Sequence, residues 1–178
     1  MMSEDTVVNN AAFVINQIYQ MSSSDVPVAP VKKTVQKMIY LIQNAGINLG
    51  YDYHLYFYGP YSADLDGDTM NLVSENIITM EYSNWGHKLT PLNNNVSLTD
   101  NIDSESVKRI IEHYSDKSWN PRKLELLATA VYAHEHGEGK DMKSVLTKVK
   151  KIKGDKYSDR EIQDILSEFE FLNIPLEE

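Results

Sequence analysis

The fold of this protein depends on one aromatic stretch, YFYGPYSADL at residues 56–65. Its first three residues are aromatic and favour extended chain, whereas Gly59 permits a turn and Pro60 fixes the backbone that leaves it. Ser62 then stands where a helix N-cap is expected, and the acidic residues after it suit the positive end of a helix dipole. The stretch therefore predicts a short strand, a tight turn and the start of a helix.

Apolar residues recur at helical spacing on both sides of this stretch, and two short β-prone segments follow it around a turn that contains Gly86. A loop rich in serine and proline, residues 22–30, separates the first two helices because proline lacks the amide donor. The predicted elements are helices over residues 6–19, 31–45 and 62–77 and strands over residues 78–82 and 87–90. Helices followed by a hairpin in this order are typical of a winged helix-turn-helix unit.

After a polar loop at residues 93–101, the second half of the chain is predicted to be helical. Pro121 follows Asn120 at the first position of a helix, and Ser158 with Glu161 forms a capping box. The predicted helices cover residues 104–114, 121–136, 142–153 and 159–169. The predicted fold is mainly α with a small β-hairpin: a winged helix-turn-helix unit over residues 1–92, followed by a C-terminal helical bundle over residues 93–178 that packs on it as a single folding unit.

The composition is that of a globular protein, since 42% of the 178 residues are hydrophobic and 24% are charged. The absence of cysteine excludes disulfides, thiolate metal sites and cysteine nucleophiles. The first ten residues lack a basic segment ahead of an apolar run, and no apolar stretch reaches the length of a membrane span. These features predict a cytoplasmic protein without membrane contact.

The formal net charge of −9 opposes the attraction that draws proteins to nucleic-acid phosphates. The charge is uneven, because residues 140–160 hold 8 basic and 3 acidic residues. The sequence therefore disfavours nucleic acid in general and leaves one basic segment as an exception.

Several segments of the chain resemble the YwgA-like family of uncharacterised bacterial and archaeal proteins. The resembling segments are residues 31–41, 56–65, 72–78, 124–129 and 157–162, with the run YGPYS the most specific. The arrangement of lysine, then glutamine, then YGP is also similar, more remotely, to the Panacea domain of antitoxins. The chain has Val31-Lys32-Lys33-Thr34 where the family has Gly-Arg-Thr. The resemblance implies a winged-helix fold and a protein-interaction or regulatory role, and it supplies no catalytic residues.

The leading hypothesis is a non-enzymatic adaptor or regulator of an antitoxin-like kind that binds another protein through its winged-helix surface. Aromatic and basic side chains that suit such a surface occur at the YGP turn and at the predicted hairpin tip. The candidate partner-binding residues are Tyr58, Tyr61, Trp85, His87 and Lys88. The alternative for the aromatic residues is structural, with the tyrosines in the core and the tryptophan packed on its own helix.

The second hypothesis is a DNA-binding transcriptional regulator that acts as a homodimer. Against it, the predicted third helix begins with Asp64, Asp66 and Asp68, whose charges repel phosphate. In its favour, a later helix carries a lysine face that can neutralise phosphates or simply face solvent. The candidate nucleic-acid-binding residues are Lys143, Lys148, Lys150, Lys151 and Lys153.

A third hypothesis is a hydrolase that holds a metal at His134 and His136. Histidines two positions apart on a helix point to different sides, unlike the pair four apart of zinc-protease helices. The chain also lacks a phosphate-binding glycine loop, a serine elbow and a paired-carboxylate motif. We therefore predict no catalytic residue, no metal and no cofactor.

Overall fold

The structure is a computed structural model that describes residues 5–22, 28–84 and 86–178. The protein has a mixed α/β fold in which most of the regular secondary structure is helical. The helices are α1 (Asn10–Met21), α2 (Lys32–Asn44), α3 (Ala63–Ser74), α4 (Ser104–Tyr114), α5 (Pro121–His136), α6 (Met142–Lys153), α7 (Asp159–Leu166) and α8 (Glu168–Phe171). The strands are β1 (Val7–Val8), β2 (His54–Tyr56), β3 (Gly59–Tyr61), β4 (Ile78–Ser83), β5 (Gly86–Pro91) and β6 (Val96–Ser97). The described strands pair as β1 with β6, β2 with β3 and β4 with β5.

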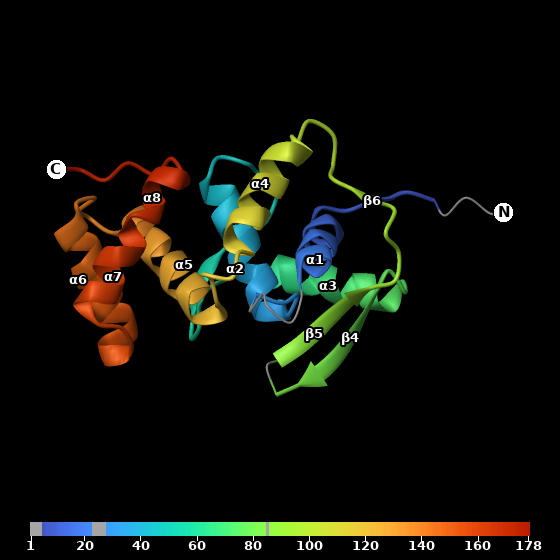
Figure 1. Cartoon of the computed structure of the whole chain (residues 1–178), viewed down its shortest axis with the longest axis horizontal. Coiled ribbons are helices and arrows are strands. Elements are labelled where there is room, and N and C mark those ends of the chain that lie inside the picture. Colours follow the sequence, from blue (N-terminus) through green and yellow to red (C-terminus); the bar gives the residue numbers. More distant parts are fainter. Residues whose placement is uncertain (1–4, 23–27, 85) are drawn as a thin grey trace.

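Helix α2 lies near the centre of the molecule, with α1, α3 and the β4–β5 hairpin on one side and helices α5 to α8 on the other (Figure 1). It contacts α1, α4, α5 and the hairpin strands β3 and β5. Helices α6, α7 and α8 gather at one end, whereas α1, α3 and the β4–β5 hairpin form the other. Elements from both halves of the chain therefore meet on α2.

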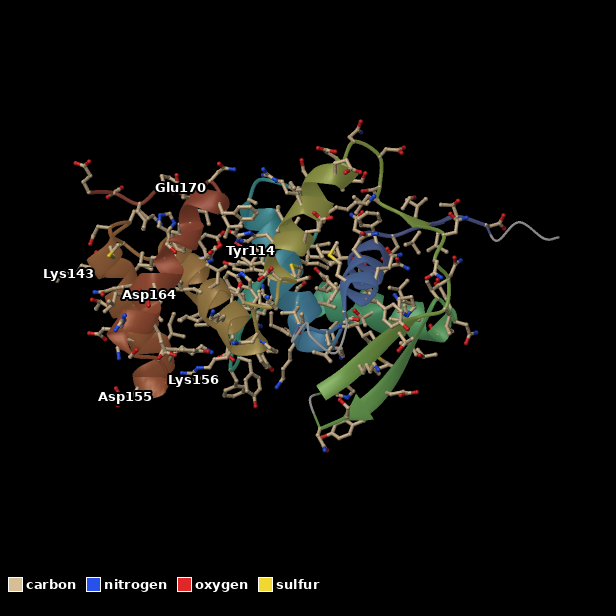
Figure 2. The ribbon with its side chains drawn as sticks, viewed as in Figure 1. Tyr114, Lys143, Asp155, Lys156, Asp164 and Glu170 are labelled. Carbon is tan, nitrogen blue, oxygen red and sulfur yellow. The ribbon has the colours of Figure 1, made fainter. Side chains whose placement is uncertain are left out.

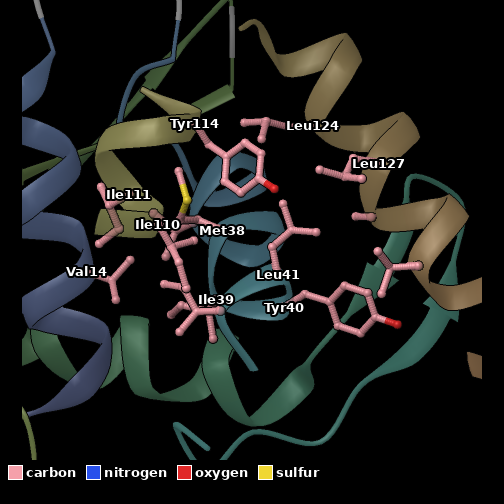
Figure 3. Packing of buried hydrophobic residues seen from close by; sticks show 14 of the residues in the cluster. Val14, Met38, Ile39, Tyr40, Leu41, Ile110, Ile111, Tyr114, Leu124 and Leu127 are labelled. Carbon is pink, nitrogen blue, oxygen red and sulfur yellow. The ribbon is translucent and has the colours of Figure 1, made fainter. Parts of the chain in front are cut away.

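The interior is one continuous hydrophobic cluster, and α2 supplies much of it because nine consecutive residues of α2 are buried, Thr34 to Ile42. Figure 3 shows its side chains between those of α1 and α4 on one side and those of α5 on the other. An amphipathic surface helix would bury only one stripe. Burial all round α2 explains why two polar residues of this helix, Gln36 and Lys37, lie inside the protein.

Most predicted elements are confirmed, including α2, the strand pair β4–β5 and the helices of the second half. Ser62 caps α3 by accepting a hydrogen bond from the backbone amide of Leu65, and Asn120 caps α5 with Pro121 in its first turn. The capping box of Ser158 and Glu161 is formed at α7. Each of these caps depends only on residues close by in the chain, which is why the sequence predicts it.

Four predicted features are wrong. The turn predicted at Gly59 and Pro60 lies one to two residues earlier, at Phe57 and Tyr58, and Gly59–Tyr61 forms the second strand of a hairpin, β3. The first helix begins after Asn9, whose side chain accepts from the amide of Ala12, and the preceding β1 pairs in parallel with β6 inside the predicted polar loop. Helix α3 ends at Ser74 because Asn76 adopts a φ of 57°. The last predicted helix is divided into α7 and α8. Part of the predicted loop at residues 22–30, residues 23–27, lies outside the described residues.

None of the helices in the described part of the chain combines the length and the apolar character that crossing a bilayer requires.

Candidate partner-binding site

The YGP stretch forms a hairpin in which β2 and β3 are joined by the two residues Phe57 and Tyr58. Tyr56 pairs with Gly59 across the hairpin, and Gly59 has a φ of 95°, which residues with a Cβ rarely adopt. A Cβ at Gly59 would also lie 3.1 Å from Oγ1 of Thr129 on α5. Glycine is therefore required here both for the turn and for the close approach of the hairpin to α5.

The base of the hairpin is attached to α2 by two buried polar side chains. Gln36 donates from Nε2 to the carbonyl of Ser62 at 2.9 Å and accepts at Oε1 from the amide of Ser62 at 2.8 Å. Lys37 donates from Nζ to the carbonyl of Pro60 at 2.8 Å. Because water does not reach these groups, each bond satisfies a backbone atom that would otherwise be unpaired. Gln36 and Lys37 thus fix where the hairpin leaves the core.

The tip of the hairpin, in contrast, is open to solvent. Phe57 is 87% exposed, Tyr56 is 62% exposed and Tyr58 is 54% exposed. Tyr56 contacts both Phe57 and Tyr61 through ring pairs with centroids 5.5 and 5.3 Å apart. We name Tyr56, Phe57 and Tyr58 the aromatic tip. A contiguous aromatic group held on a buried base is the arrangement found at binding surfaces.

Two lysines contact the aromatic tip. The ammonium of Lys33 lies 3.9 Å from the ring centroid of Tyr58, a cation–π contact. Lys153, on α6, donates to the carbonyl of Phe57 at 3.4 Å. Because the side chain of Lys153 is buried and paired with Glu125, the exposed positive charge beside the tip is that of Lys33.

Glu125 on α5 joins the tip to the C-terminal helices. One of its oxygens accepts from Lys153 and from Lys156, each at 2.7 Å. Burial acts to raise the pKa of Glu125, but the hydrogen bonds from Lys153 and Lys156 outweigh it and lower the pKa below its ordinary value. The carboxylate is therefore charged and holds α6 against α5 beside the hairpin.

Burial lowers the pKa of Lys37 to about 8, with Lys153 and Lys33 acting in the same direction and Glu125 opposing them. The unfolded chain, with a lysine pKa near 10.5, then binds more protons than the folded one at alkaline pH, so the folded state gains stability as pH rises through this interval. We expect the free energy of unfolding to increase by about 2 kcal/mol between about pH 8 and pH 9.5 through this lysine.

Urea denaturation across this pH interval measures the effect, with Lys37→Met as the matched variant, since methionine keeps the chain length and cannot titrate. The rise should be absent from Lys37→Met. The interval ends below pH 10 because burial raises the pKa of tyrosines such as Tyr40, whose ionisation in the unfolded chain has the opposite sign. If the free energy of unfolding rose with pH in parallel for the two proteins, the rise would not come from Lys37.

The structure brings some of the sequence-predicted residues together. Tyr58 and Tyr61 lie on the β2–β3 hairpin, with Tyr58 outside the core and Tyr61 half-buried. His87 and Lys88 lie on β5, and Lys88 pairs with Val31 just before α2 begins. Both hairpins therefore reach the N-terminal part of α2. Trp85 lies outside the described residues.

Sequence reasoning missed the most exposed aromatic residues. The sequence predicts Tyr56 and Phe57 as strand residues and does not single out Tyr82 on β4, which is 82% exposed and contacts His87 edge-on. The available signal for Phe57 is Gly59, because a glycine favours a tight hairpin turn and turn residues lie at the surface. The exposure of Tyr82 depends on the side of the hairpin that meets the core, which the tertiary structure decides.

The lysines of α6 are partly engaged inside the protein. Lys150 pairs with Asp159 at 3.1 Å and donates to the carbonyl of Tyr157, and Lys153 binds Glu125. Figure 2 shows Lys143 and Lys156 at the same end of the molecule as Asp155, Asp164 and Glu170. This end thus presents mixed charge. Lys143 and Lys151 are exposed and Lys148 is half-buried.

His134 and His136 point to different partners. A ring nitrogen of His134 lies 2.7 Å from the carbonyl of Pro175, whereas His136 stacks on Tyr132 with centroids 4.1 Å apart. Within residues 5–22, 28–84 and 86–178, no group of three or more histidine, cysteine or acidic residues is placed to hold a metal ion.

The geometry of this site is therefore a rigid hairpin with an aromatic, lysine-flanked tip. Comparison of the chain with protein-family models and with curated proteins finds no match.

Proposed function

We propose that this protein is a non-enzymatic cytoplasmic adaptor or regulator that binds a protein partner through the aromatic tip. The single observation that carries the proposal is the contrast between the buried base of the β2–β3 hairpin and the exposure of Phe57. We further propose that residues 1–92 form a winged helix-turn-helix unit and residues 93–178 a helical bundle packed on it. The order α1, α2, α3, β4, β5 supports the first assignment.

Aromatic side chains on a rigid support make efficient anchors for a partner. They bury a large apolar area on binding, and few rotatable bonds are immobilised. The attachments of Gln36 and Lys37 hold the hairpin in one position before binding, which lowers the entropic cost of association. The resemblance to the YwgA-like family and to the Panacea domain agrees with an antitoxin-like regulatory role.

DNA reading is the weaker hypothesis. The first turns of α3 carry Asp64 and Asp66, and Asp66 already pairs with Lys32. Two of the five α6 lysines are engaged in ion pairs within the protein. Little positive charge therefore remains on these elements to bind nucleic-acid phosphates.

Site-specific photocrosslinking in the host tests the proposal. We expect a photoreactive phenylalanine analogue at position 57 to form one discrete crosslinked species, because this side chain would lie at the centre of the interface. The measurement is denaturing electrophoresis followed by identification of the crosslinked protein. The same analogue at Gln163, an exposed position on α7 away from the hairpin, is the matched control.

The identified partner is then titrated with purified protein. Tyr56→Ser should weaken its binding about tenfold or more, since an aromatic anchor contributes at least about 1.4 kcal/mol. Two outcomes would show that the aromatic tip is not part of the interface. One is equal crosslinking at positions 163 and 57, and the other is an unchanged affinity of Tyr56→Ser for the partner.

A further inference from the structure

A second concave site lies apart from the aromatic tip, where the C-terminal ends of α2 and α5 meet the segment that leads into β2. It is a pocket of about 310 Å³. Its lining residues are Tyr40, Gln43, Asn44, Tyr51, Asp52, Tyr53, His54, Glu135 and His136. The proposed function uses none of these side chains.

Apart from the histidines His54 and His136, the charged side chains that line this pocket have one sign. Its lining includes the carboxylates Asp52 and Glu135, and none of the described lining residues is a lysine or an arginine. In the part of the chain that the structure describes, neither the Asp52 carboxylate nor Oε1 of Glu135 takes part in a hydrogen bond or ion pair, while Oε2 of Glu135 accepts from the hydroxyl of Tyr40 at 2.8 Å and lies 3.5 Å from His136. The pocket therefore offers unused anionic acceptors.

Tyrosine rings form the walls. The rings of Tyr40 and Tyr53 lie with centroids 4.9 Å apart at 53°, and Figure 3 shows Tyr40 projecting from α2 toward α5. The hydroxyls of Tyr40, Tyr51 and Tyr53 already donate to Glu135, Asp68 and the Gln36 carbonyl respectively. The donors of these rings are thus used inside the protein. Tyr40 is only 2% exposed, so the aromatic surface that remains for a ligand is that of the half-buried Tyr51 and Tyr53, and ring faces attract cations.

The backbone also contributes negative electrostatic potential at this pocket. Helix α2 ends at Asn44 and α5 ends at His136, and the C-terminal end of a helix carries partial negative charge. At α5 the protein already places an ammonium, since Lys140 donates to the carbonyls of His134 and Glu135 from outside the pocket lining. Lys140 therefore offsets the negative end of α5, and the carboxylates and the end of α2 are the groups that favour a further cation.

We propose that this pocket binds a small organic cation, an ammonium or guanidinium group carried on an aliphatic chain. Asp52 and Glu135 would neutralise the charge, and the tyrosine rings would cover the group and its apolar stem. The same chemistry is offered by a free polyamine and by a lysine or arginine side chain of another protein. The site stands independently of the aromatic tip and of the partner proposed for it.

Isothermal titration calorimetry with spermidine tests the proposal. We expect saturable binding that weakens with added salt, and no binding of 1-pentanol, a neutral aliphatic chain of comparable length. Glu135→Gln and Asp52→Asn should each weaken the binding of spermidine about tenfold. Glu138→Gln, which removes the same charge from an exposed neighbour outside the lining, is the matched control and should bind as the wild type does.

A second titration, with Nα-acetyl-lysine amide and Nα-acetyl-arginine amide, distinguishes the two sources of the cation. Tighter binding of spermidine identifies a free amine, and tighter binding of an amino-acid amide identifies a side chain of a partner. Urea denaturation of each variant establishes that it is folded. Absence of binding by all three cations, or equal weakening by Glu138→Gln, would overturn the proposal.

Discussion

Replacing Gln36 by leucine is expected to lower the free energy of unfolding by about 3 kcal/mol. The side chain is buried, and its amide makes hydrogen bonds to both the N–H and the C=O of Ser62. Leucine has a similar volume, so the core stays filled, but both backbone groups of the buried Ser62 lose their partner. Each unpaired group costs about 1–3 kcal/mol in the interior.

Urea denaturation measures this loss, and amide hydrogen exchange locates it. The amide of Ser62 should exchange faster in Gln36→Leu than the amides of α5, because the base of the hairpin loses its attachment to α2. Gln163→Leu makes the same chemical change on the exposed face of α7 and should alter stability by less than about 0.5 kcal/mol. A loss below about 1 kcal/mol for Gln36→Leu would show that the attachment is not needed.

Replacing Glu125 by leucine is expected to cost about 3 kcal/mol near neutral pH. The side chain of Lys153 is only 6% exposed and that of Glu125 15% exposed, so the variant leaves an ammonium in the interior without its carboxylate. Lys37 also loses the nearby negative charge that favours its protonated form. Removing one partner of a buried ion pair destabilises a protein by more than the intact pair stabilises it, because the remaining charge stays desolvated.

The pH dependence of this effect has a definite sign. The folded pKa of Glu125 lies below the value of 4.5 for the unfolded chain, so its contribution is complete above that pH and is lost as pH falls through the folded pKa. The stability difference between wild type and Glu125→Leu, measured by urea denaturation, should therefore shrink in acid. Glu170→Leu, at an exposed position on α8, is the control. A difference that does not change with pH would contradict the role of the carboxylate.

Local signals account for the parts of the fold that the sequence predicts. The caps at Ser62, Asn120 and Ser158 act on amides within three residues, and the turn around Gly86 joins two strands that are neighbours in the chain. The parallel pair β1–β6 was missed because its strands have only two residues each and come from segments far apart in sequence. No periodicity develops over two residues.

At the candidate site, too, some features follow from the local sequence and others only from the tertiary structure. The sequence pointed to Tyr58 and Tyr61 because the residues around them specify a turn, and it offered their place in the core as the alternative. That Gln36 and Lys37 are buried beneath this turn depends on α5 covering α2 from the far half of the chain. Hydrophilic side chains in a helical pattern are otherwise expected at the surface.

By itself, the sequence determined the helical character of the chain, most of its element boundaries, the absence of cysteine chemistry and the presence of a turn in the stretch YFYGP, because each depends on the composition or on residues close together in the chain. The tertiary structure alone decided which aromatic residues are exposed, that Lys150 and Lys153 are engaged in ion pairs, and that Tyr40, Asp52 and Glu135 line one pocket. These features arise where α2, α5 and α6 meet. Burial and charge pairing depend on contacts between segments distant in sequence, which no local pattern specifies.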